Sequence, residues 1–212
     1  MDDDRQPMFN APWPALLIAV VILVVYGAQS FLPAEQILPR WAFSPQALEQ
    51  GRYETLVSAL FLSGSWPHAL ANSAGALAFG TPLARLFGGK FAGAGAFFLF
   101  CLVCGALSNL GFALVHPGGQ MLLVGASGAV SALMAAASRI IAGRGGMGPI
   151  LSAPVIGMGI AWLVVNLLVA VLGFAPGMGD APVAWEAHLF GFAAGALLAG
   201  PFAWLARRDI SD

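Results

Sequence analysis

The chain alternates long apolar runs with short polar connections. Each run is about long enough to cross the hydrocarbon core of a bilayer as a helix, which takes about 20 mostly apolar residues. The pattern therefore predicts an all-α integral membrane protein, a bundle of six transmembrane helices that forms a single domain over residues 1–212. The predicted spans are residues 14–31, 68–87, 91–115, 124–141, 150–174 and 188–205.

The only long connection follows the first span and has an amphipathic pattern of its own. Ser44 followed by Pro45 is typical of a helix N-cap with proline at the first helical position. Residues 46–61 then mix charged side chains with leucine, valine and phenylalanine. This segment predicts one helix that lies in the outer membrane interface.

Composition supports a membrane location. Of the 212 residues, 59% are hydrophobic and 9% are charged, whereas soluble domains carry about 25% charged residues. The formal net charge of -1 gives no indication of nucleic-acid binding. Cys101 and Cys104 lie one helical turn apart inside the third span, with no further cysteine or histidine near them in sequence. We interpret them as buried small hydrophobic residues and predict no metal site.

The distribution of basic residues predicts the orientation. If the N-terminus is cytoplasmic, only Arg40 and Arg52 fall outside, and the cytoplasmic side receives Arg5, Arg85, Lys90, Arg139, Arg144, Arg207 and Arg208. The positive-inside rule therefore places both termini in the cytoplasm. The acidic start of the chain lacks the basic region of a cleaved signal, so we expect Met1 to begin the mature protein.

Four polar residues fall at a similar shallow depth below the outer surface. In this orientation the second, fourth and sixth spans all run inward; His68 and Asn72 open the second, Ser127 the fourth and His188 the sixth. Polar side chains inside spans are costly and commonly functional. Taken singly, a serine that bonds its own helix would be structural. Taken jointly, the four residues predict a functional site.

Small residues offer a way to bring two of these groups together. His188 shares a helix face with Gly191 and Gly195, a spacing that lets a neighbouring backbone approach closely. We assign these two glycines and Gly125 to helix packing. The fourth span has a stripe of small residues that could pack there: Ser127, Ser131 and Ala135. The deeper Asn109 and Asn166 are interpreted as interhelical hydrogen-bonding residues, and His116 as a loop residue.

A serine and a histidine in contact could act as nucleophile and base. Since no aspartate or glutamate lies within a span, the simplest arrangement is a Ser127–His188 dyad. A developing oxyanion would find donors in the His68 ring, the Asn72 amide and the backbone N–H groups of Ser127 and Gly128.

Three motifs resemble the signature motifs of rhomboid intramembrane serine proteases. They are His68-Ala-Leu-Ala-Asn72, Gly125-Ala-Ser127-Gly128 and Ala187-His188-x-x-Gly191-x-x-x-Gly195. The resemblance implies Ser127 as nucleophile, His188 as base, and His68 with Asn72 at the oxyanion site. It also implies membrane-protein substrates that are cut in or near a transmembrane helix in the lipid bilayer, without metal or cofactor. We expect a location in a bacterial inner membrane.

The sequence departs from the family pattern at three positions. Arg52 follows Gly51 and lies upstream of the usual Trp-Arg position, and Ser63 stands where many relatives have histidine. Ser131 stands where an aromatic residue often stacks on the catalytic histidine. These departures predict an atypical support for His188 and an altered specificity pocket.

Two other functions fit parts of the pattern. A non-catalytic membrane protein could bind or guide client helices with the same fold. A transporter would need polar residues on both sides of the membrane, whereas this cluster lies on one side only. For a protease, the fifth span and the Gly- and Pro-containing loop at 175–186 are the expected gate for substrates.

Overall fold

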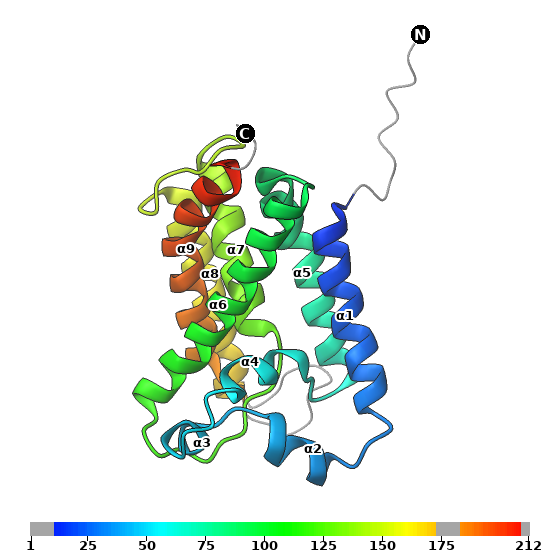
Figure 1. The fold of residues 1–212 in the computed structure, drawn as a ribbon. Coiled ribbons are helices and arrows are strands. Elements are labelled where there is room, and N and C mark those ends of the chain that lie inside the picture. The colour runs from blue at the N-terminus through cyan, green and yellow to red at the C-terminus, as the bar shows by residue number, and fades with distance from the viewer. Residues whose placement is uncertain (1–10, 173–182, 209–212) are drawn as a thin grey trace.

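The computed structural model describes residues 11–172 and 183–208, and these ranges fold into a bundle of helices (Figure 1). Three short helices and a 3₁₀ turn lie between the first and second long helices: α2 (Ala34–Trp41), α3 (Pro45–Glu49), α4 (Thr55–Ser58) and the turn Ala59–Phe61. The long helices are α1 (Trp13–Gln29), α5 (Trp66–Phe87), α6 (Phe91–Val115), α7 (Ser127–Ala142), α8 (Ala153–Leu172) and α9 (Trp185–Arg208). They lie at the six apolar runs, and the predicted all-α membrane fold is confirmed.

The long helices differ in how they meet the surrounding lipid. In the described part of the chain, α6, α8 and α9 are long and apolar enough to cross a membrane. Helix α7 has only 16 residues, but it packs against α5, α6, α8 and α9 and is buried from Gly128 to Ile140. Helix α7 is thus enclosed by protein along most of its length.

Helices α7 and α9 pack with their backbones in direct contact. A Cβ atom at Gly191 would lie 2.3 Å from the Gly128 carbonyl oxygen, and one at Gly195 would lie 2.3 Å from that of Ala132. Only glycine fits at these two positions. The closest backbone contacts of α9 are therefore with Gly128 and Ala132, one residue after Ser127 and Ser131 of the predicted stripe. The predicted approach of Ser127 to the histidine of α9 is nevertheless present.

The predicted single helix over residues 46–61 was wrong. The Ser44 cap is confirmed, because its Oγ accepts a hydrogen bond from the Ala47 N–H at 3.1 Å. The helix then ends early: Gly51 has φ +80°, and the Arg52 N–H donates to the Ala47 carbonyl at 3.0 Å. This left-handed glycine and its backbone bond form a Schellman-type C-cap. Helix α2, which the sequence analysis did not predict, lies beside these elements at one end of the bundle (Figure 1).

Arg52 holds this first loop together. Its guanidinium donates to the Pro39 carbonyl at 2.8 Å and to the Arg40 carbonyl, so it satisfies carbonyl groups at the end of α2. Its Nε also lies 3.4 Å from Glu54. Arg52 is therefore a structural residue of the first loop.

Several predictions concern residues outside the described ranges. The acidic start at Met1–Arg5, the last two residues of the fifth predicted span and most of the 175–186 loop lie there. Within the described part, Cys101 and Cys104 are buried, as predicted, and both are free thiols.

Candidate active site

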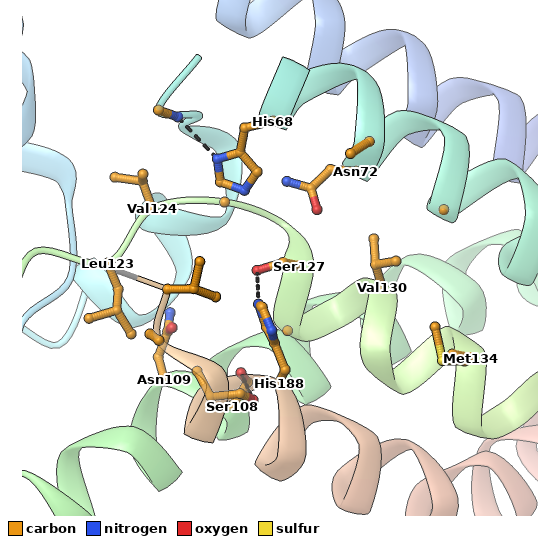
Figure 2. A pocket seen from close by; sticks show the side chains of 18 of the residues that line it. His68, Asn72, Ser108, Asn109, Leu123, Val124, Ser127, Val130, Met134 and His188 are labelled. Carbon is orange, nitrogen blue, oxygen red and sulfur yellow. Dashed lines mark hydrogen bonds between the residues drawn. The ribbon is translucent and has the colours of Figure 1, made fainter. Parts of the chain in front are cut away.

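The first turn of α5 positions two polar side chains. Ser65 caps the helix by accepting the His68 N–H at 3.2 Å, and Pro67 occupies the first turn. His68 and Asn72 are four residues apart, so both project from one face of α5 toward the cavity shown in Figure 2. Both side chains are buried.

Hydrogen bonding makes His68 a donor toward this cavity. Its Nδ1 accepts the Gly64 N–H at 3.2 Å, so in the neutral ring the proton lies on Nε2. The Asn72 Nδ2 is also buried and has no hydrogen-bond partner among the described residues. Unpartnered buried donors are rare in native proteins and call for an explanation. The cavity is therefore lined by the Nε2–H of His68 and by an Asn72 amide that has no partner in the described part of the chain.

Gly125 lies directly against these donors. A Cβ atom there would lie 2.8 Å from His68 Nε2 and 3.3 Å from Asn72 Nδ2, and the residue has φ +119°. Both the conformation and the close approach require glycine. The sequence analysis assigned Gly125 to helix packing; the structure instead places it in the turn before α7, where it leaves room beside His68.

Ser127 and His188 are brought together by the packing of α7 on α9. Ser127 is the first residue of α7, and its Oγ lies 2.8 Å from Nε2 of His188 in the first turn of α9 (Figure 2). The start of α9 is anchored to α6, because Ser108 Oγ donates to the Ala187 carbonyl at 2.6 Å. The N–H groups of Ser127 and Gly128 belong to the first turn of α7, so they have no intrahelical acceptor.

A third polar residue, Asn166 of α8, contacts the histidine. Its Oδ1 lies 2.6 Å from His188 Nδ1, and its Nδ2 donates to the Trp162 carbonyl at 2.8 Å. The sequence predicted an interhelical hydrogen bond for Asn166 but not its partner, and the expected dyad omitted this residue. The available signal was the i, i+4 spacing of Trp162 and Asn166 on one face of the fifth span.

Trp162 and Ser131 complete the surroundings of the histidine. The Trp162 ring lies 5.7 Å from the His188 ring at an interplanar angle of 34°. Its Nε1 donates to Ser131 Oγ at 3.1 Å, and Ser131 donates to the Ser127 carbonyl at 2.8 Å. The aromatic neighbour of His188 therefore comes from α8, while the position four residues after Ser127 is occupied by a small, fully buried serine.

The remaining polar residues near the site bond elsewhere. His116 is more than a loop residue, because its Nε2 lies 3.0 Å from Glu186 Oε1 and its ring packs on Phe112. Glu186 belongs to the first turn of α9 and is thus engaged with His116. Asn109 donates to the Leu56 carbonyl at 3.0 Å and ties α6 to the first loop.

The four predicted polar residues line one cavity of about 440 Å³. Its apolar walls come from the segment before α7, from α7 and from α8: Met121, Leu122, Leu123, Val124, Val130, Met134 and Trp162. A cavity of this size and lining is suited to a short stretch of extended chain with apolar side chains.

The fold and the site define a helical multi-span membrane protein with a serine–histidine pair in a partly apolar cavity. The family model described as "Rhomboid domain" matches residues 50–204. The chain therefore belongs to the rhomboid family, an intramembrane protease-type family, and the resemblance of its three motifs is confirmed. No curated protein matches the chain.

Proposed function

We propose that this protein is an active intramembrane serine endopeptidase. The observation that carries the proposal is the 2.8 Å contact between Ser127 Oγ and His188 Nε2, inside a cavity that is also lined by His68 and by an Asn72 amide with no partner among the described residues. In this proposal Ser127 is the nucleophile, His188 is the general base, and His68 and Asn72 stabilise the oxyanion together with the N–H groups of Ser127 and Gly128.

The chemistry follows from these positions. Ser127 Oγ attacks the scissile carbonyl while His188 Nε2 takes the hydroxyl proton. The negative charge that develops on the carbonyl oxygen is met by N–H donors already directed into the cavity. His188 then returns the proton to the leaving amine, the C–N bond breaks, and an acyl-enzyme forms. Water hydrolyses this ester by the same steps in reverse order.

The substrates proposed are membrane proteins cut in or near a transmembrane helix. The partly apolar cavity supports a peptide segment taken from the bilayer. The basic residues support cytoplasmic termini, with the site near the outer face of a bacterial inner membrane.

Replacing the nucleophile tests the proposal. Purified protein in detergent or liposomes should cleave a model transmembrane substrate and be labelled by a fluorophosphonate at Ser127. Ser127→Ala should abolish both signals and leave the unfolding transition unchanged, and His188→Ala should abolish cleavage. Ser30→Ala is a matched control, because Ser30 is exposed and bonds only within its own turn, to the Gly27 carbonyl at 2.8 Å. Wild-type protein that binds substrate helices but neither labels nor cleaves would instead identify a non-catalytic rhomboid-like protein.

A further inference from the structure

A backbone carbonyl determines which end of the Asn166 side-chain amide donates a hydrogen bond and which end accepts one. The Trp162 carbonyl can only accept, so the Asn166 group that faces it at 2.8 Å is the amide nitrogen. The other end of the amide, Oδ1, can also only accept, and it lies 2.6 Å from His188 Nδ1. Nδ1 of the histidine must therefore carry a proton.

The proton on Nδ1 also determines which group donates in the contact between the imidazole and the serine. A neutral ring protonated on Nδ1 has its lone pair on Nε2, and Nε2 lies 2.8 Å from Ser127 Oγ. The Ser127 hydroxyl is thus the donor, and the ring is the acceptor that a general base must be. In the other tautomer, Nδ1 and Oδ1 would face each other as two acceptors in a buried site.

Trp162 constrains the same ring from its face. The indole lies 5.7 Å from the imidazole, and its own orientation is set by the 3.1 Å bond from Nε1 to Ser131 Oγ. The side chains that hold the tautomer and the plane of His188 therefore both come from α8, one helical turn apart.

Asn166 is an exception on its helix. Within α8, only Val155 and Asn166 are buried, and the helix otherwise turns leucine, isoleucine and valine side chains outward. A buried asparagine in a lipid-facing helix is costly unless its amide is satisfied. Both polar ends of this amide are satisfied, and one of its two partners is the histidine itself.

We propose that Asn166 is a positioning residue that fixes the tautomer of His188, with Trp162 orienting the ring, so that α8 completes the catalytic centre. The expected effect of Asn166 on catalysis rests on the proposed function. The arrangement of His188 can be tested independently of activity.

The test compares two substitutions that differ in the acceptor. Asn166→Leu has similar volume but no acceptor, whereas Asn166→Asp retains an acceptor toward Nδ1. In Asn166→Leu, kcat should fall at least about 10-fold and by at most about 10⁴-fold, the loss seen when an orienting group enforces the wrong tautomer. KM should not change, because Asn166 touches the histidine and not the substrate. Val165→Ala is the matched control, since Val165 is adjacent on α8 and exposed to lipid.

Asn166→Asp should recover part of the lost activity, because one carboxylate oxygen still accepts from His188 Nδ1. The recovery should be incomplete, because the other oxygen faces the Trp162 carbonyl, to which the Asn166 amide donates. A carboxylate also stabilises the protonated imidazole, which cannot act as a base. The acid side of the pH–rate profile should consequently move to higher pH in Asn166→Asp. A residue that only stabilised the fold would not shift this profile.

The ¹⁵N imidazole spectrum reports the tautomer directly. The chain has only three histidines, and the His188 signals can be assigned with His188→Ala. We expect protonated Nδ1 and unprotonated Nε2 in the wild type, and a mixed population in Asn166→Leu. Unchanged kcat and tautomer in Asn166→Leu would overturn the inference and leave the proposed protease intact. If the wild type neither labels nor cleaves, the proposed function fails, and the spectrum alone decides the role of Asn166.

Discussion

In the proposed protease, Asn72 would be a single buried donor kept ready for a charge that develops only during the reaction. Its Nδ2 is buried and without a partner among the described residues, which costs about 1–3 kcal/mol relative to a bonded donor. The donor faces the same point beside Gly125 as His68 Nε2 does. Two N–H donors that face one position suit the negatively charged oxygen of an oxyanion better than the oxygen of a neutral carbonyl.

Asn72→Ala should therefore slow cleavage without eliminating it. Loss of one oxyanion donor typically lowers kcat about 10²–10³-fold, and the His68 ring and the backbone N–H groups of α7 would remain. Steady-state cleavage of a transmembrane substrate and the rate of fluorophosphonate labelling should fall together. Asn72→Asp should be slower still, because it places an acceptor where a donor is needed. Wild-type rates in Asn72→Ala would exclude the residue from the oxyanion site.

At the scale of elements, the serine–histidine contact depends on how closely α7 and α9 approach. The Cβ positions at Gly191 and Gly195 fall 2.3 Å from carbonyl oxygens of α7. Any side chain there separates the helices, and separation at this interface moves His188 away from Ser127. The close packing of small residues between α7 and α9 therefore also sets the distance between Ser127 and His188.

Gly195→Ala should destabilise the protein by roughly 1–3 kcal/mol, as overpacking of a tight interface does. Gly95→Ala is the matched control. Gly95 is inside α6 with nothing within 4 Å of its Cβ position, so alanine should be neutral or stabilise the helix by up to about 1 kcal/mol. Unfolding in mixed micelles measures both free energies. Equal effects of the two substitutions would show that close packing of α7 and α9 does not limit stability.

The sequence predicted the six apolar helices and the residues that meet in the cavity, because hydrophobic runs and shared depth are properties of single segments. It did not predict several details of how two segments meet, nor one local turn. The contact face of α7 is set by backbone clearance against Gly191 and Gly195. The partner of Asn166 depends on how α8 packs beside α9. Gly51 ends α3 through its left-handed conformation, although the apolar pattern continues beyond it.

At the scale of the whole molecule, the proposed protease would give α8 two roles that interfere with each other, as the gate for substrates and as the support of His188. It packs mainly on α7 and is the most lipid-exposed of the candidate spans, with 11% of its apolar window buried. These properties suit a helix that moves aside to admit a substrate from the bilayer. The same helix carries Asn166 and Trp162, which hold His188. Displacement of α8 would admit the substrate but loosen the base, so the helix must close again before the chemical step.

A reversible cross-link between α8 and α5 separates these two roles. Cysteines placed beside Trp162 and Phe79, which line the same cavity, would be introduced into a Cys101→Ala, Cys104→Ala background. Each would be joined by a disulfide to a bis-methanethiosulfonate spacer that spans the cavity, which gives the oxidised form. If α8 is the gate, the oxidised protein should lose cleavage of a transmembrane substrate and regain it on reduction. Fluorophosphonate labelling of Ser127 should persist in the oxidised form, because a small probe needs no helix movement and a closed α8 keeps His188 in place. Undiminished cleavage in the oxidised form would place substrate entry elsewhere. Loss of both signals would show instead that the cross-link had distorted the site.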